Sequence, residues 1–177
     1  ETDFAGRTTV YGYSELPMSC GSCTVSDRPT RIVYPDGSVT ERLYDSEGRL
    51  LAQTIASGTT QSATTTYAYD QKGQVTSLTA PDGAVTRHAY DQRGRLVAVT
   101  DPLGRKTSYA YDAKGRRLSA ADPMGRATRW RYDGRGNVAE SVSPAGASTK
   151  YIHDAANRLA RTVDATGATT RYAYDTR

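Results

Sequence analysis

Asp101-Pro-Leu-Gly-Arg-Lys-Thr-Ser-Tyr-Ala-Tyr-Asp-Ala-Lys-Gly-Arg116 is a copy of a pattern that returns along most of the chain. Its most regular part is a Tyr-Asp pair with a Gly three residues after the Asp. The residues of this repeat signature are Tyr44, Asp45, Gly48, Tyr69, Asp70, Gly73, Tyr90, Asp91, Gly94, Tyr111, Asp112, Gly115, Tyr132, Asp133, Gly136, Tyr174 and Asp175, with His153, Asp154 and Asn157 as a variant copy. From Asp70 onward the Asp residues are 21 residues apart, a constant period that is typical of stacked-repeat proteins.

Each repeat contains two turn signals. An Asp followed three residues later by Gly favours a type I turn, because the carboxylate accepts backbone hydrogen bonds and Gly adopts positive φ. A second Gly stands eight residues before the Asp of every copy except that of Asp70, usually after Pro-x, at Gly37, Gly83, Gly104, Gly125, Gly146 and Gly167. The short segments between the turns predict two strands per repeat.

The strand that enters the Tyr-Asp turn has the alternating pattern Thr-x-aromatic-x-Tyr, as in Thr107, Tyr109 and Tyr111. Period two places these three side chains on one face of a half-buried strand. The position five residues after the Asp is apolar, with Arg117 as the exception, at Leu50, Val75, Leu96, Val138 and Leu159. We therefore predict an all-β array of antiparallel β-hairpins with ladders of tyrosine and of aliphatic side chains across the sheet.

The composition bears on how thick the core can be. Val, Leu, Ile and Phe together number 24 of 177 residues, whereas there are 13 tyrosines and the net charge is only +4. Tyrosine packs its ring while its hydroxyl stays hydrated or hydrogen-bonded. A thin, curved sheet with one wet face fits this composition better than a thick, dry core.

The repeat also predicts the domain organisation. Residues 1–13 are interpreted as the end of a preceding repeat, because Asp3 and Asp45 are 42 residues apart, twice the period. Residues 14–30 form an irregular insertion, and residues 31–177 form a single array of tandem repeats. A longer hairpin loop within 56–65 absorbs four extra residues. The chain lacks an initiator Met and ends inside a turn, so we expect it to be a fragment of a longer chain.

Tyr-Asp-x-x-Gly-Arg-Leu followed by Asp-Pro-x-Gly-x-x-Thr-x-Tyr-x-Tyr-Asp resembles the Rhs/YD-repeat family over residues 31–177 and in part over 1–13. The number of copies in register makes the resemblance specific. It implies a spiral sheet that is part of a larger hollow β-shell, as in bacterial Rhs polymorphic toxins, toxin-complex subunits and the related teneurins.

The resemblance also implies a function. Bacterial members enclose a C-terminal toxin domain and deliver it to competing cells, often by type VI secretion. The expected role is thus a structural wall segment of a secreted or delivered protein. Its partners would be neighbouring repeats, the enclosed toxin and, through other parts of the parent, secretion-apparatus proteins.

An alternative function is a carbohydrate-binding or cell-surface adhesion module whose exposed tyrosine ladders stack on glycans. The two functions differ in whether the aromatic rings lie on an accessible face.

Cys20 and Cys23 are the weak candidates for a metal site. Their spacing is that of a zinc half-site, but a small disulfide loop, or thiols that are free or pair elsewhere, are the alternatives. A zinc site needs two further ligands, and His88 and His153 both occupy aromatic positions of the repeat. We therefore expect no cofactor.

The repeated aspartates do not predict catalysis. Calcium needs six to eight oxygen ligands around one point, whereas the turns already explain one Asp each. Repetition makes all these carboxylates equivalent, so we predict no catalytic residue and no enzyme activity.

Arginines interleaved with tyrosines could bind single-stranded nucleic acid, because the rings stack on bases and the arginines contact phosphates. These arginines are Arg95, Arg116, Arg126, Arg129, Arg131, Arg135 and Arg158. Because aspartates alternate with them, we interpret them as a solvated strand face and expect no nucleic acid; no stretch has the length of a membrane span.

The two ends of the fragment are predicted to expose unpaired strand edges. We therefore expect copies of the isolated chain to associate edge to edge. Light scattering over a range of concentrations measures this, and a clean monomer at high concentration would contradict it.

Overall fold

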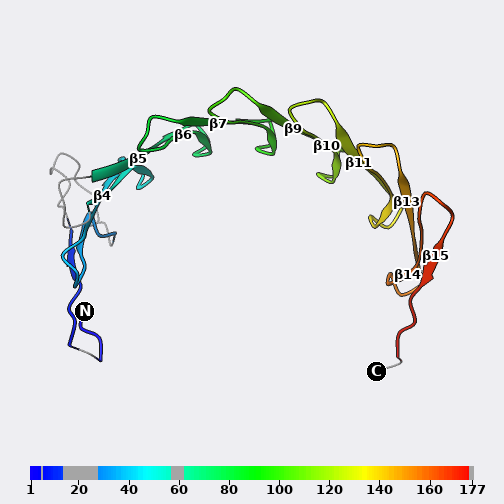
Figure 1. Cartoon of the computed structure of the whole chain (residues 1–177), viewed down its shortest axis with the longest axis horizontal. Helices are drawn as coiled ribbons and strands as arrows, with labels where there is room; N and C mark the ends of the chain where they lie inside the picture. The colour runs from blue at the N-terminus through cyan, green and yellow to red at the C-terminus, as the bar shows by residue number, and fades with distance from the viewer. Residues whose placement is uncertain (5, 14–27, 57–61, 176–177) are drawn as a thin grey trace. The chain divides into compact units, whose positions relative to one another are not determined.

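The computed structural model describes residues 1–4, 6–13, 28–56 and 62–175. Within these ranges the regular secondary structure consists of β-strands, without a helix. The strands are antiparallel and follow one another in the sheet in sequence order (Figure 1). The predicted all-β array of hairpins is therefore confirmed. The strands are β1 (Val10–Gly12), β2 (Arg31–Val33), β3 (Val39–Tyr44), β4 (Leu50–Ala56), β5 (Ser62–Tyr69), β6 (Val75–Thr79), β7 (Val85–Tyr90), β8 (Leu96–Thr100), β9 (Lys106–Tyr111), β10 (Arg117–Ala121), β11 (Ala127–Tyr132), β12 (Val138–Val142), β13 (Ser148–His153), β14 (Leu159–Val163) and β15 (Thr169–Arg171).

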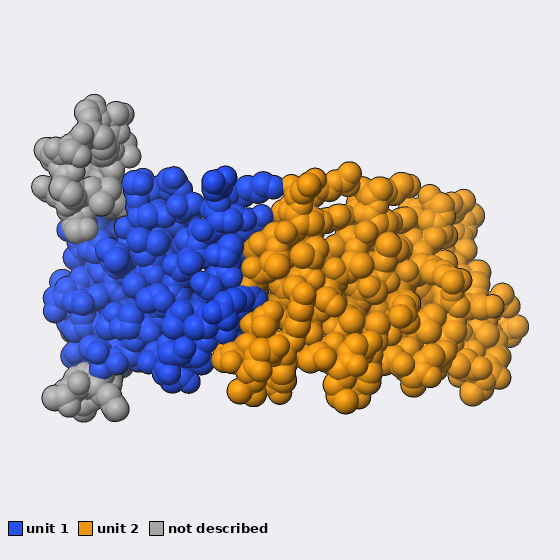
Figure 2. Space-filling model, turned by 90° about the horizontal axis from the view of Figure 1, so that it is seen from above, with its two compact units in different colours: residues 1–87 blue, residues 88–177 orange. Residues whose placement is uncertain are grey.

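The chain divides into two compact units, residues 1–87 and residues 88–177 (Figure 2). The first unit contains β1 to β6 and the beginning of β7, and the second contains the end of β7 and β8 to β15. In the second unit, β8 to β15 are joined in sequence by tight turns, so that this unit is a run of hairpins.

The two turns of a repeat have the same backbone structure. At Asp112, the Gly115 NH donates to the Asp112 carbonyl and the Asp112 NH donates to the Arg116 carbonyl, at 3.1 and 2.9 Å. The turn at Asp101 has the same two bonds, at 2.9 and 3.0 Å. The prediction of a left-handed closing residue is confirmed, with φ of 87° at Gly115 and 68° at Asn157. Asp101 is thus the first residue of its turn, as Asp112 is of the other. The sequence analysis described this turn only by its Pro-x-Gly pattern and did not predict a role for Asp101.

A β-bulge follows each Tyr-Asp turn for which the register is described. In β12, Val138 pairs with Tyr132 and Glu140 pairs with Arg131, so Ala139 is the extra residue. The bulge returns Val138 to the face of Tyr132 and sends Glu140 to the opposite face. The other bulged residues are Leu51, Thr76, Leu118 and Ala160. The sequence analysis did not predict these bulges.

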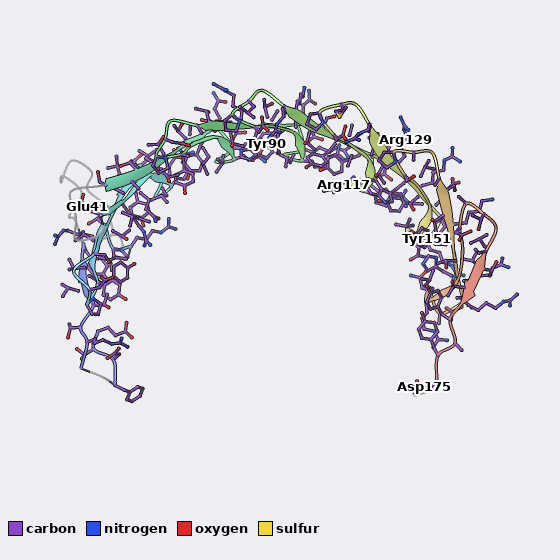
Figure 3. All side chains as sticks on the ribbon, viewed as in Figure 1. Glu41, Tyr90, Arg117, Arg129, Tyr151 and Asp175 are labelled. Carbon is purple, nitrogen blue, oxygen red and sulfur yellow. The ribbon has the colours of Figure 1, made fainter. Side chains whose placement is uncertain are left out.

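Burial alternates along the strands that enter the Tyr-Asp turns. In β11, Thr128, Trp130 and Tyr132 are half-buried, whereas Arg129 and Arg131 are exposed. In Figure 3, Arg117 and Tyr151 lie on one side of the second unit and Arg129 lies on the other. We call these the tyrosine face and the opposite face. Tyr132 pairs with Val138 and His153 with Leu159, so the residue five after the Asp lies beside the aromatic residue on the tyrosine face.

The interior of the sheet is thin. Among the described residues only Ile32, Ala98 and Thr40 are close to full burial, at 5%, 5% and 4% exposure. Most other strand residues are half-buried at best. The sheet must therefore gain much of its stability from contacts other than a dry hydrophobic core.

The extra residues between Asp45 and Asp70 do more than lengthen a loop. Ala56 ends β4 and Ser62 begins β5, which are the longest described strands at 7 and 8 residues. The two strands pair in register from Ala52 with Thr66 to Ala56 with Ser62. The expectation of a longer loop is corrected to this extent, because part of the insertion continues the hydrogen-bonded ladder.

Candidate functional site

The feature repeated along the array is a set of contacts around the Asp of the Tyr-Asp pair. Oδ1 of Asp112 accepts hydrogen bonds from the backbone NH groups of Lys114 and Arg116, both at 2.9 Å. Oδ2 accepts a hydrogen bond from Nε of Arg116 at 2.6 Å. The Asp112 and Arg116 side chains are 17% and 27% exposed, so this ion pair is largely shielded by the sheet.

The arginine then reaches the next repeat. The Arg116 guanidinium carbon lies 4.5 Å from the centroid of the Tyr132 ring, within the range of a cation–π contact. The Tyr132 hydroxyl donates to the backbone carbonyl of Arg117 at 2.8 Å. We call this arrangement of carboxylate, guanidinium and ring the Asp–Arg–Tyr clamp.

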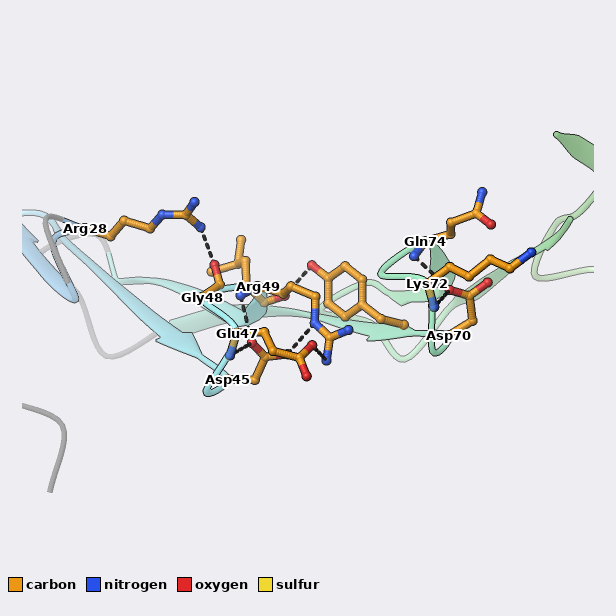
Figure 4. Close-up of polar contacts among 10 residues, drawn as sticks. Arg28, Asp45, Glu47, Gly48, Arg49, Asp70, Lys72 and Gln74 are labelled. Carbon is orange, nitrogen blue, oxygen red and sulfur yellow. Dashed lines mark hydrogen bonds and ion pairs between the residues drawn. The ribbon is translucent and has the colours of Figure 1, made fainter. Parts of the chain in front are cut away.

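Clamps with the same contacts recur in both units. The further copies are Asp45–Arg49–Tyr69, Asp91–Arg95–Tyr111 and Asp154–Arg158–Tyr174. Their tyrosine hydroxyls donate to the carbonyls of Leu50, Leu96 and Leu159 at 2.8 to 2.9 Å. Figure 4 shows the clamp that begins at Asp45 and Arg49.

The clamp explains why Tyr and Asp are adjacent in the sequence. Tyr111 is covered by Arg95 of the preceding repeat, whereas Asp112 holds Arg116, which covers the tyrosine of the following repeat. The Tyr111-Asp112 pair therefore ends one clamp and begins the next. The two clamps that begin at Asp91 and Asp112 thus link three successive repeats of the second unit.

Burial favours the hydroxyl as a donor in this arrangement. Burial raises the pKa of the Tyr69 hydroxyl above its ordinary value. The hydroxyl therefore stays protonated and keeps its hydrogen bond to the Leu50 carbonyl.

The arginines on the rings were interpreted from sequence as part of a solvated strand face, and for Arg95, Arg116 and Arg158 this was wrong. They lie in turns and are held in ion pairs.

We call the contact region between two successive repeats a joint. In the second unit, the joint between the repeats of Asp133 and Asp154 has a different chemistry. Asn137 replaces the arginine, and its Nδ2 donates to Oδ2 of Asp133 at 3.0 Å and to Oδ1 of Asn157 at 2.5 Å. His153 replaces the tyrosine that an arginine would cover. A recess of about 450 Å³ lies here, lined by Asp133, Gly134, Arg135, His153, Asp154 and Ala155. An amide–amide contact thus replaces the clamp here.

The structure places the other sequence candidates as follows. His153 lies in β13 and His88 in β7, both in half-buried positions. Cys20 and Cys23 lie outside the described residues. Among residues 1–4, 6–13, 28–56 and 62–175, no group of three His, Cys, Asp or Glu side chains is arranged to hold a metal ion. The described part of the chain has no helix that is long and apolar enough to cross a membrane.

Nine of the turn carboxylates have lowered pKa values. For Asp91 and Asp154 the first cause is the hydrogen bond from the backbone NH of Arg95 or Arg158, and the arginine side chain adds to it. The pKa is lowered also for Asp36, Asp45, Asp101, Asp112, Asp122, Asp133 and Asp164. A carboxyl with a lowered folded-state pKa stabilises the fold above its unfolded pKa, and this stabilisation is lost as the pH falls through the folded pKa.

We therefore expect acid to destabilise the chain. The melting temperature should be nearly constant between about pH 7 and pH 5 and should fall below about pH 4, as the turn carboxylates become protonated. Thermal unfolding followed by circular dichroism at a series of pH values measures this. The variant Asp91→Asn/Asp154→Asn, which keeps an acceptor oxygen in both turns, should lose less stability in acid. A melting temperature that rises below pH 4 would contradict the expectation.

Comparisons with known proteins agree with this architecture. Residues 30–177 match the teneurin YD-shell family. No curated protein sequence matches the chain. The crystal structure of TcdB2-TccC3 without its hypervariable C-terminal region is 18% identical, with a TM-score of 0.62 over 79% of this chain and 8% of that chain. The Tc holotoxin pore of Photorhabdus luminescens with a mutated TccC3 is also 18% identical, with a TM-score of 0.61 over the same shares.

These structures support the fold, and the chain spans about 8% of their length. The family match covers most of the chain and includes all four Asp–Arg–Tyr clamps. The chain belongs to the teneurin YD-shell family.

Proposed function

We propose that this chain is a wall segment of a shell that encloses a C-terminal toxin domain for delivery to a target cell. The observation that carries the proposal is the repetition of the Asp–Arg–Tyr clamp, because it joins successive hairpins and singles out no repeat as a catalytic centre. The likeness to TcdB2-TccC3 supports a shell segment of a much longer protein.

The tyrosine face suits a wall that holds a cargo without binding it tightly. Its rings are half-buried, and the clamp hydroxyls are already bonded to backbone carbonyls. A cargo would therefore meet a surface of ring edges and polar groups rather than a deep apolar pocket. The partners in this proposal are neighbouring repeats, the enclosed toxin and, through other parts of the parent protein, a bacterial secretion apparatus. Type VI secretion and interbacterial competition are the proposed setting.

The carbohydrate-binding alternative has less support from the clamp. Stacking on a sugar needs an open ring face, whereas Arg95, Arg116 and Arg158 each cover a tyrosine ring. The aromatic residues two positions before the Tyr-Asp pair also have partners. The guanidinium carbon of Arg117 lies 4.9 Å from the centroid of the Tyr109 ring, and the Tyr151 hydroxyl shares a hydrogen bond with the Ser141 hydroxyl. These five tyrosines, Tyr109, Tyr111, Tyr132, Tyr151 and Tyr174, thus already have partners within the sheet.

Limited proteolysis of the longer parent protein tests the encapsulation. Size exclusion and mass spectrometry should show a C-terminal piece that stays intact, travels with the repeat array and becomes sensitive only after denaturation. A C-terminal piece that is digested freely while the array survives would contradict encapsulation and would direct the next tests to glycans.

Matched variants make the test specific to the clamps. Arg116→Gln/Arg158→Gln removes two clamp cations and should speed digestion of the C-terminal piece. Arg129→Gln/Arg131→Gln removes the same number of charges from the exposed face of β11 and should leave the digestion rate unchanged. Equal rates for the two double variants would show that the clamps do not maintain the wall.

A further inference from the structure

The charge of the chain is distributed unevenly between the two units. Residues 1–87 contain 7 Lys and Arg against 10 Asp and Glu, whereas residues 88–177 contain 16 against 9. The net charges are therefore −3 and +7. An asymmetry of this kind between two halves of a chain is typical of proteins that bind an anionic surface with one half.

Part of this positive charge gathers on the opposite face of the second unit. Arg129 and Arg131 lie in β11, Lys150 in β13, Arg161 in β14 and Arg171 in β15, and all five are exposed. The strand register puts them on one face. Arg131 and Lys150 both pair with Glu140, and Arg161 pairs with Arg171. We call these five residues the basic face.

Acidic residues compensate little of this charge. Glu140 is the one acidic residue in the described strands β11 to β15, and its side chain is only 20% exposed. It accepts a hydrogen bond from Ser148 at 2.6 Å and lies 3.2 Å from Arg131. Arg161 and Arg171 stand directly opposite each other, an arrangement of like charges that is unfavourable in an isolated sheet. A bound anionic surface would relieve this repulsion.

Aliphatic side chains lie between the cations. Val142 pairs with Arg129, Val163 with Lys150 and Ile152 with Arg161, so each shares the basic face. All three aliphatic residues are partly exposed. Long cations beside short aliphatic groups fit the boundary between lipid headgroups and acyl chains, where the stems lie against apolar atoms and the charges meet phosphates.

We propose that the basic face docks on a membrane that contains anionic lipids. Clusters of four to eight Lys and Arg are sufficient for attraction to such surfaces. A nucleic acid fits less well, because the aromatic rings that could stack on bases lie on the tyrosine face. This docking is independent of the enclosed cargo, since it uses the face opposite to the clamps.

Vesicle co-sedimentation of the full 177-residue chain tests the proposal. The chain should bind vesicles of phosphatidylcholine with phosphatidylserine, should not bind vesicles of phosphatidylcholine alone, and should be released by 1 M salt. The double variant Lys150→Gln/Arg161→Gln should lower the partition coefficient about 30-fold. The control Lys72→Gln/Lys114→Gln removes the same charge from turn residues and should change it by less than about 3-fold.

Each other outcome overturns the proposal. Absence of binding to phosphatidylserine vesicles would remove the docking surface. Equal losses in the two double variants would show that net charge acts without the basic face. Tighter binding to a duplex oligonucleotide than to the vesicles, in the same buffer, would assign the face to nucleic acid instead. Circular dichroism melting of both variants, with temperatures equal to that of the parent chain, confirms that folding is not the cause.

Discussion

A half-buried carboxylate in a tight turn is the constraint from which the rest of the structure follows. Asp112 fixes its turn through two backbone NH groups that bind one carboxylate oxygen, and its second oxygen pairs with a cation. Arg116 supplies that charge and then covers the ring of Tyr132. Because few side chains of the described sheet are deeply buried, these contacts replace much of the dry core of an ordinary domain. Each contributes little alone, but in a repeat array such nearest-neighbour contributions accumulate.

The joint between the repeats of Asp133 and Asp154 shows what the clamp provides. Here Asn137 and His153 replace arginine and tyrosine together, so the carboxylate of Asp133 is bonded to an amide instead of a guanidinium. The amide contact between Asn137 and Asn157 still links the two turns, but a recess is left beside His153. Local opening in repeat proteins begins where neighbour contacts are weakest, so this joint is the natural place for the second unit to loosen.

Much of the fold could be predicted because turn residues and the alternation of strand residues recur in every repeat. Gly115 and Asn157 marked turns that require positive φ, and Thr107, Tyr109 and Tyr111 marked one half-buried face. The clamp was missed because it joins residues 16 to 20 positions apart across two hairpins, which periodicity alone does not pair. Bulges such as that at Ala139 have no strong sequence signal, and the basic face emerges only from the cross-strand register. Cys20 and Cys23 lie outside the described residues, so their roles remain predictions.

The central claim is that arginine couples consecutive repeats through the tyrosine ring. A double-mutant cycle in urea with Arg116→Gln and Tyr132→Leu measures this coupling directly. We predict a coupling energy of about 1 kcal/mol for this pair and a value near zero for Arg129→Gln with Tyr132→Leu, whose side chains lie on opposite faces of β11. A coupling between Arg116 and Tyr132 no larger than that of the control pair would contradict the account.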